Sequence, residues 1–398
     1  MSPAPLKLLE GVRIVSLSAF LIGPAAAQYL ADMGADVVKI EEPSRGPHER
    51  HWSGADTFPN GVSAFFLMSN RNVRSVAVNL KSDAGRQIVQ ELCREADAVI
   101  TNFRPPVMER LGLDYDSLRA ENASLVYGCA SGYGSESPHR DLPGQDLLLQ
   151  AITGMAASTG TEGPPNAAGS AVIDQHAASL LAMGVLSALY HRAVTGEGQR
   201  VEVTMAEAAI DLQAEAYTYQ LSGTDLQRPS HGLATTFHEA PYGFYEVSDG
   251  YVALSISPIA LISEALGNPP ELEPFLDPAV SFSRRAEIYD ALSPLLTGYS
   301  KVELISLLRA SGVWCAPVNS IEEAIADPVM EHLDPFHEFD HPRAGKVRVP
   351  GHPINYSSGT AALTRQPPDL GEHTGEVLGS LGYDETKVAN LRDEGVIR

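Results

Sequence analysis

One carboxylate, that of Asp174, stands where it could act as a nucleophile. A Gly- and Pro-rich approach, 159–170, precedes it, and the short run 169–173 predicts a strand that ends just before it. The long apolar run 177–193 that follows predicts a helix. Unpaired backbone N–H groups at the start of a helix favour a carboxylate there. The window is thus compatible with a plain N-cap aspartate and with a reactive carboxylate.

Signals for other kinds of catalysis are weak. The turn after the first expected strand, 16–24, holds one glycine, Gly23, where a dinucleotide-binding turn needs three. No Walker loop, HExxH or GxSxG sequence occurs. Cys93, Cys129 and Cys315 have no metal-type spacing and are odd in number, as expected of reduced thiols in a cytoplasmic protein. We therefore expect no metal and no nicotinamide or flavin.

Composition excludes further classes of protein. The 398 residues contain 28 Lys and Arg against 50 Asp and Glu, a formal net charge of −22, so no nucleic-acid partner is expected. An anionic ligand must instead be held by local arginines or lysines. The start of the chain, 1–5, lacks a signal-peptide pattern. The longest apolar run carries His176, His191 and Arg192, which argues against a membrane span.

The elements that must position Asp174 alternate between strand and helix in the first half of the chain. The expected strands are 12–17, 36–40, 73–78, 98–101, 125–129 and 200–203. The expected helices are 24–33, 83–96, 174–194 and 205–221. Such alternation predicts an α/β fold, with a parallel sheet covered by helices on both faces.

The second half of the chain follows a different pattern. A hairpin is expected at 243–247 and 251–255, helices at 283–296 and 301–310, and a last helix opening near 374. We expect the N-terminal part of a large domain at 1–224, a small domain at 225–325, and a C-terminal segment, 326–398, that returns to the large domain.

Several segments in a fixed order resemble one protein family. They are Leu9–Val15 with Gly23–Pro24, Gly34–Glu41, Asn72–Val76, Asn102–Pro105 with Arg110–Gly112, Gln150–Gly154, Thr195–Gln199, Gly312–Val318 and Leu370–Thr374. In this order and spacing the chain resembles the class III CoA-transferases, the family of formyl-CoA transferase and the carnitine CoA-transferases. The resemblance implies a Rossmann-like large domain with a parallel sheet, a smaller α+β domain, and a homodimer whose two chains are interlocked rings.

The resemblance implies that Asp174 is the catalytic nucleophile. Its carboxylate would attack the thioester of an acyl-CoA donor and form a mixed anhydride and CoA thiolate. The thiolate would return to give an aspartyl-CoA thioester. A free acceptor acid would then attack this thioester, and CoA would leave on the new acyl group. Acyl-CoA is a substrate in this scheme, and no tightly bound cofactor is expected.

Positions that match CoA contacts of the family are expected to bind CoA here. They are Leu21, Ile22, Asn79, Leu80, Lys81, Asn102, Phe103, Arg104, Arg110, Gln145 and Asp146, with Arg71 and Arg74 as weaker candidates. The chain departs from formyl-CoA transferase-like members at Glu42, where they place an arginine. A polyglycine loop between 221 and 267 and a glycine shortly after Asp174 are also missing.

The closest alternative is an α-methylacyl-CoA racemase, which uses a histidine in a Gly-His-Asp step. The matching residues here are Gly144, Gln145 and Asp146, and glutamine cannot act as a base. His139 and His176 are candidates to replace that histidine, although a loop and a packing role are the plainer interpretations. An isomerase that transfers CoA within one molecule and a non-catalytic CoA-binding protein are the remaining alternatives.

Overall fold

The computed structural model describes residues 5–230 and 232–398, so most of the N-terminal segment used to judge a signal peptide lies outside it. The strands are β1 Arg13–Leu17, β2 Asp36–Glu41, β3 Val73–Ala77, β4 Ala98–Thr101, β5 Val126–Ser131, β6 Arg200–Thr204, β7 Gly243–Val247, β8 Gly250–Leu254, β9 Cys315–Pro317, β10 Phe336–His341 and β11 Gly345–Pro350. The helices are α1 Ile22–Asp32, α2 Ala64–Ser69, α3 Asp83–Glu95, α4 Pro105–Leu111, α5 Tyr115–Arg119, α6 Asp146–Ile152, α7 Met155–Ser158, α8 Val172–Thr195, α9 Met205–Leu212, α10 Ala214–Leu221, α11 Ile259–Ala265, α12 Arg285–Leu296, α13 Lys301–Ala310, α14 Ile321–Ile325, α15 Pro328–Leu333, α16 Thr374–Ser380 and α17 Glu385–Asp393.

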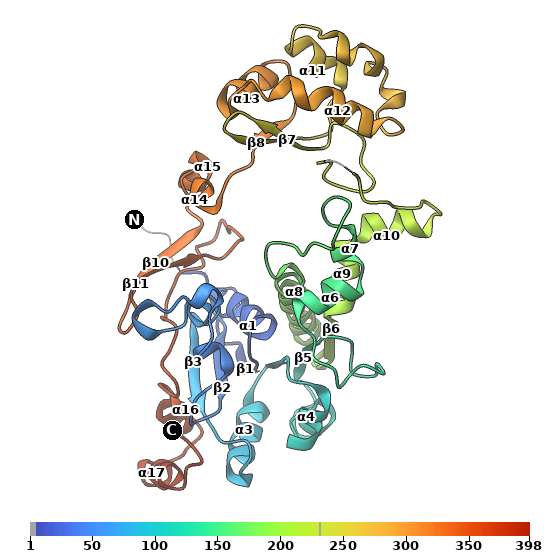
Figure 1. Ribbon diagram of the computed structural model, residues 1–398. Helices are drawn as coiled ribbons and strands as arrows, with labels where there is room; N and C mark the ends of the chain where they lie inside the picture. The colour runs from blue at the N-terminus through green and yellow to red at the C-terminus, as the bar shows by residue number, and fades with distance from the viewer. Residues whose placement is uncertain (1–4, 231) are drawn as a thin grey trace. The chain divides into compact units, whose positions relative to one another are not determined.

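A six-stranded sheet organises the large part of the chain, in the order β3-β2-β1-β4-β5-β6 (Figure 1). Every neighbouring pair in it is parallel. Four successive residues of β1 are buried, as expected for a strand covered on both faces. The predicted α/β fold with a parallel sheet is confirmed. The strand order reverses between β1 and β4, and ligands of such sheets bind at the carboxyl ends of the strands beside this point.

Helices α1 and α8 pack against each other, and α8 also lies on β5 and β6. The approach of α8 to β5 is close because Gly128 lacks a side chain. A Cβ at this position would lie 2.6 Å from Val185 Cγ2. Other helices, among them α3, α5, α16 and α17, contribute to a separate apolar core that includes Val15, Val38 and Val99 of the sheet.

The C-terminal residues pack onto the sheet through this core. Val377, Leu378 and Leu391 belong to it, and α16 lies beside β3 (Figure 1). Before them, β10 and β11 form an antiparallel hairpin that the sequence pattern did not predict.

The chain divides into two compact units. The first contains residues 1–149, 171–208 and 335–398, and the second contains 150–170 and 209–334. These bounds differ from the expected domain boundaries, since 150–170 and 209–224 cluster with the small domain. Hydrogen bonds join these segments to each other and to the residues that follow. Gln213 Nε2 and the Tyr217 hydroxyl donate to the Thr153 carbonyl oxygen at 3.3 and 3.1 Å, and Arg228 Nη1 donates to the Pro164 carbonyl oxygen at 2.9 Å. That the units fold as separate domains stays a prediction.

The second unit is built around the predicted hairpin, which β7 and β8 confirm. The short strand β9 extends it to three antiparallel strands. Tyr245, Val252, Ile262 and Leu292 form part of the core between this sheet and its helices.

Two expected elements are wrong. The run 169–173 is not a strand, because α8 already begins at Val172. The expected helix 205–221 is two helices, α9 and α10, interrupted at Gln213. The Gln213 side chain donates to the Ala209 carbonyl oxygen and to Thr153, and such side-chain bonds to the backbone compete with continuous helix.

Helix α8 is long and apolar enough to cross a membrane by length and composition alone. Core helices of soluble proteins meet the same criterion. Here α8 packs on α1, β5 and β6 and carries buried residues such as Ile173, Leu181 and Val185. Its position in the fold is that of a sheet-covering helix.

Candidate active site

Asp174 lies in the first turn of α8, as the third helical residue. Ala171 occupies the N-cap, so the N-cap interpretation of Asp174 is wrong. Since β6 follows α8 and runs parallel to the other strands, α8 must begin at the carboxyl edge of the sheet. The same edge carries the start of α1, which follows β1. The carboxyl group of Asp174 is therefore placed at the edge where parallel α/β sheets bind ligands.

The Asp174 carboxyl group is partly buried. Burial, together with the negative charge of Asp146, raises the pKa of Asp174 from 3.8 to about 7. The dipole of α8 opposes this rise, but a helix terminus contributes only ~0.3 to 1 kcal/mol, less than one pKa unit. Desolvation therefore dominates. The group titrates near neutral pH, where an exposed aspartate is fully ionised.

Asp146 fixes the start of α8. Its Oδ2 accepts hydrogen bonds from the backbone N–H groups of Ile173 at 2.8 Å and Asp174 at 3.0 Å. These are two of the donors that a helix leaves unpaired at its N-terminus. Asp146 thus caps α8 from a distant part of the chain, at the first residue of α6. The sequence did not indicate this capping role of Asp146, because a cap normally stands directly before its own helix.

The loop after β1 carries two of the expected CoA contacts, Leu21 and Ile22, and both side chains are buried. Asn102, in the loop after β4, holds this loop in place. Its Oδ1 accepts from the Ala19 N–H at 2.9 Å, and its Nδ2 donates to the Ala19 carbonyl oxygen at 2.7 Å. The loop is also tight at Gly23, where a Cβ would meet the Ser18 Cβ at 2.4 Å. The structure therefore brings Leu21, Ile22 and Asn102 together between β1 and β4.

Aromatic side chains lie beside this loop, and the sequence analysis did not identify them. The Phe20 and His48 ring centroids are 5.4 Å apart, and those of His48 and Trp52 are 6.3 Å apart. Phe20 is 46% and Trp52 43% exposed, although both are large and apolar. The signal in the sequence that could have indicated these aromatic residues was Trp52, which lies in a loop rich in glycine, proline and histidine.

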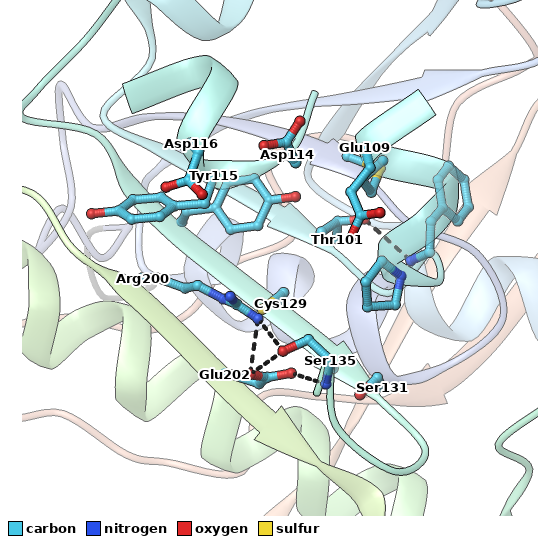
Figure 2. A pocket seen from close by; sticks show the side chains of 15 residues that line it. Thr101, Glu109, Asp114, Tyr115, Asp116, Cys129, Ser131, Ser135, Arg200 and Glu202 are labelled. Carbon is cyan, nitrogen blue, oxygen red and sulfur yellow. Dashed lines mark hydrogen bonds and ion pairs between the residues drawn. The ribbon is translucent and has the colours of Figure 1, made fainter. Parts of the chain in front are cut away.

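Phe103 lines a cavity of about 270 Å³ that reaches from the end of β4 across β5 and β6. Figure 2 shows Arg200 hydrogen-bonded to Ser135 and Glu202 on one side of it, and Tyr115 on the other. The Arg200 Nη2 atom lies 2.6 Å from Ser135 Oγ and 2.9 Å from Glu202 Oε2. Phe103 is the only expected CoA contact that lines this cavity, within the described ranges.

Three further expected CoA contacts lie at the protein surface. Arg104 is exposed, and its Nη1 donates to the Asp141 carbonyl oxygen at 2.9 Å. Arg110 is exposed in the last turn of α4. Gln145 is exposed next to Asp146.

Asn79, Leu80 and Lys81 follow β3 at the same carboxyl edge of the sheet. Asn79 Oδ1 accepts from the Lys81 N–H at 3.0 Å, which stabilises the turn. Leu80 packs against the apolar core, and Lys81 is exposed. In the sheet, β2 and β1 separate this stretch from the loop after β4.

Arg71 and Arg74 are not available for a ligand phosphate, so these weaker candidates are wrong. Arg71 is buried, with its Nε and Nη2 atoms 3.0 and 2.6 Å from the carboxylate oxygens of Asp32. Arg74 binds both carboxylate oxygens of Asp36, at 2.9 and 2.5 Å, and Glu376 at 3.0 Å. Bidentate pairs of this kind satisfy the guanidinium within the fold.

The two histidines proposed as alternative bases have different surroundings. His139 is exposed and makes an edge contact with Tyr133, with ring centroids 5.8 Å apart. His176 is partly buried on α8, two residues after Asp174, and residues at that spacing do not face each other on a helix. Gln175, next to Asp174, donates through Nε2 to the Tyr29 hydroxyl of α1. Across residues 5–230 and 232–398, no group of three or more His, Cys, Asp or Glu side chains could hold a metal ion.

Comparisons with known proteins identify the family. Residues 9–374 match the family described as CoA-transferase family III. The chain is 33% identical to an acyl-CoA transferase of Fusarium pseudograminearum, over 98% of this chain and 88% of that protein. It is 30% identical to the succinyl-CoA:glutarate CoA-transferase of Mus musculus, over 98% of this chain and 91% of that protein. A crystal structure of a CAIB/BAIF family protein from Brucella suis superposes with a TM-score of 0.81 at 29% identity, over 95% of this chain and 100% of the other. The chain therefore belongs to CoA-transferase family III and is an enzyme that transfers CoA to carboxylic acids.

Proposed function

We propose that Asp174 is the nucleophile of this CoA-transferase and carries the acyl group and then CoA as covalent intermediates. The observation that carries the proposal is the raised pKa of Asp174, about 7, at the carboxyl edge of the sheet. A desolvated carboxylate is more basic than an exposed one, and so a stronger nucleophile once ionised. With a pKa of about 7, enough of the Asp174 carboxyl group is ionised at neutral pH to react.

The reaction runs through four substitutions at carbonyl carbons. The Asp174 carboxylate attacks the thioester carbonyl of the donor, giving a mixed anhydride and CoA thiolate. The thiolate attacks the aspartyl carbonyl, which releases the donor acid and leaves an aspartyl-CoA thioester. The acceptor carboxylate displaces the thiolate to form a second anhydride. The thiolate then attacks the acceptor carbonyl and regenerates Asp174. Each step conserves the acyl energy, provided that water is excluded.

Asp146 and Asn102 act as positioning residues in this proposal. Asp146 holds the backbone of Asp174 through the hydrogen bond at 3.0 Å and raises the pKa of its side chain. Asn102 fixes the loop of Leu21 and Ile22, the residues expected to contact CoA. Holding the thioester beside the carboxylate provides the effective concentration that a carboxylate lacks in water.

Racemisation is the weaker alternative. The family to which the chain belongs transfers CoA, and Gln145 offers no base at the position of the racemase histidine. Deuterium uptake at the α-carbon of an acyl-CoA, without exchange of acyl groups, would favour the racemase.

The test is covalent trapping. Purified protein is incubated with succinyl-CoA and no acceptor, reduced with borohydride, and digested for mass mapping. We expect reduction of Asp174 to the corresponding alcohol, and none in Asp174→Asn. The same variant should bind CoA but transfer nothing. Continued transfer by Asp174→Asn, with no adduct in the wild-type protein, would exclude the proposed nucleophile.

We also propose a homodimer with interlocked chains, at a cytoplasmic location. Family membership supports the dimer, and so do large apolar side chains with high exposure in the single chain, such as Tyr190 at 74% and Ile321 at 82%. Light scattering coupled to size-exclusion chromatography should give twice the 42.5 kDa mass of the chain.

A further inference from the structure

The first turn of α8, which carries Asp174, is held by side chains from other parts of the first compact unit. Its N-cap residue, Ala171, makes no side-chain hydrogen bond to it. Helix ends fray when their terminal groups are not fixed. Asp146 fixes the two backbone N–H groups described above. A further contact, through a side chain of the turn itself, comes from α1.

Gln175 makes this further contact. It follows Asp174 directly, and its Nε2 donates to the hydroxyl oxygen of Tyr29, in the last turn of α1. Neither side chain takes part in the proposed substitutions at carbonyl carbons. Gln175 is exposed, and ordering an exposed glutamine costs side-chain entropy. Its bond can therefore hold the helix only if the partner, Tyr29, is itself fixed.

Tyr29 is fixed through its ring. The ring meets that of His352 edge to face, with centroids 5.8 Å apart and the two planes at 83°. Aromatic pairs prefer this arrangement. His352 follows β11 in the chain, and its side chain is only 3% exposed. The Tyr29 hydroxyl is thus placed by the packing of its ring, and Gln175 reaches a position that is already set.

Asp32 fixes His352 in turn. Its Oδ2 lies 3.3 Å from His352 Nδ1, and since a carboxylate oxygen accepts, Nδ1 carries the proton of this bond. The same carboxylate accepts from Arg71 Nε and Nη2 at 3.0 and 2.6 Å and from Asn72 Nδ2 at 2.8 Å. These donors fill the roughly four acceptor sites of a carboxylate. The buried cluster therefore has one arrangement, and it holds the His352 ring in that arrangement.

This arrangement is costly for the fold. His352 Nε2 is buried and has no hydrogen-bond partner among the described residues. A buried acceptor without a donor costs free energy, and a buried ion pair such as Arg71 and Asp32 is often no more stable than apolar packing. What the cluster supplies is a fixed orientation for the ring of Tyr29.

We propose that Tyr29 and Gln175 are positioning residues for the nucleophile. Their hydrogen bond holds the first turn of α8 against α1 and so keeps the carboxyl group of Asp174 aligned with the thioester carbonyl. The inference rests on the proposed function, because it takes Asp174 as the attacking group. Both residues act through the backbone of α8 and touch no reacting atom. A misplacement of about 1 Å can cost ~100-fold in rate, so such a contact matters for catalysis.

The test measures how fast Asp174 forms its covalent adduct with succinyl-CoA, by rapid quenching and mass mapping of the full chain. Tyr29→Phe keeps the ring and removes the hydroxyl. We expect roughly ten-fold slower adduct formation, between the effect of one neutral hydrogen bond and that of a 1 Å misplacement. The affinity for CoA, measured by isothermal titration calorimetry, should not change. A purely structural contact would leave the rate of the folded protein unchanged.

Gln175→Leu and the double variant show whether the two residues act as a pair. If they act through their hydrogen bond, either single substitution and the double substitution should slow the reaction by the same factor. Tyr356→Phe is the matched control. Its ring also lies near that of His352, with centroids 6.1 Å apart, but its hydroxyl donates to Met33 Sδ at 3.4 Å. This variant should react at the wild-type rate.

Four outcomes would overturn the inference. Tyr29→Phe can react as fast as the wild-type protein, or it can weaken CoA binding by the same factor as the rate. The losses of the two single variants can multiply in the double variant, or Tyr356→Phe can slow the reaction equally. None of these results affects the proposed nucleophile, as long as the wild-type protein forms the adduct on Asp174. If the wild-type protein forms no adduct, the proposed function fails together with this inference.

Discussion

Asp174 should destabilise the folded protein at neutral pH, and the Asp174→Asn substitution should relieve this cost. The folded protein binds the Asp174 proton more tightly than the unfolded chain does, since burial raises the pKa from 3.8 to about 7. The stability contributed by the protonated carboxyl group is fully present below the unfolded pKa. It is lost as pH rises through the folded pKa. The neutral amide of the Asp174→Asn variant does not titrate, so its contribution to stability should not depend on pH.

The magnitude follows from the width of this window. Between pH 5.5 and a pKa of about 7 lie about 1.5 units, each worth ~1.36 kcal/mol, so the advantage of Asp174→Asn should grow by about 2 kcal/mol between pH 5.5 and pH 8. Because the side chain is only partly buried, water screens part of this effect, and we expect ~1 to 2 kcal/mol. That corresponds to a relative gain in Tm of roughly 2 to 6 °C for a unit of this size.

Scanning calorimetry at pH 5.5 and pH 8 measures this difference, and both values lie above the sequence pI of 4.9. Asp83→Asn is the matched control. Asp83 also lies in the first turn of a helix, α3, but its side chain is 96% exposed. It should show no comparable gain between the two pH values. If the Tm of Asp174→Asn differs from that of the wild-type protein by the same amount at pH 5.5 and at pH 8, the argument that the carboxyl group is desolvated is refuted.

Three further predictions concern Asp146, the loop held by Asn102, and two ion pairs of the fold. The turnover rate should rise with pH through an acid limb near pH 7, because the nucleophile must be ionised; Asp146→Asn removes a negative charge and should move the limb to lower pH by less than about 1.5 units, as burial is the larger cause of the shift. A limb that does not move in that variant would exclude Asp146 as a cause. Asn102→Ala removes two hydrogen bonds to Ala19 and should weaken CoA binding about ten-fold in calorimetry, with a smaller effect on turnover of bound substrate. Unchanged CoA affinity would show that the loop holds without Asn102. Arg71→Met takes the guanidinium away from the buried Asp32 carboxylate, which keeps only its contacts with Asn72 and His352, and should cost ~3 to 5 kcal/mol by urea denaturation. Arg74→Met, whose partners are 44% and 58% exposed, should cost ~1 kcal/mol or less. Equal losses in the two variants would contradict this assignment.

The sequence was sufficient where one local pattern decided the structure. The β-branched and apolar runs of β1, β2 and β3 predict buried parallel strands because they lack the alternation of a half-exposed sheet. Helix α3 was equally readable, with Ser82 as its N-cap and its apolar residues on one face. Turn chemistry located the hairpin of β7 and β8.

The sequence misled where distant residues decide a local conformation. The run before Asp174 has the composition of a strand, yet it starts a helix whose N–H groups are capped by Asp146, 28 positions earlier. Gln213 interrupts a continuous helical pattern by bonding to Thr153, 60 positions away. Arg71 and Arg74 resembled phosphate ligands, since a sequence does not reveal that Asp32 and Asp36 already neutralise them.

The sequence by itself determined the family, the parallel sheet and the candidate nucleophile, because each depends on residue types in a fixed order along the chain. Only the tertiary structure decided the chemical state of that nucleophile. The pKa of Asp174 depends on how much water reaches its carboxyl group and on the charge of Asp146 beside it. Both are properties of positions in space, and they arise only when α6 and α8 meet at the edge of the sheet.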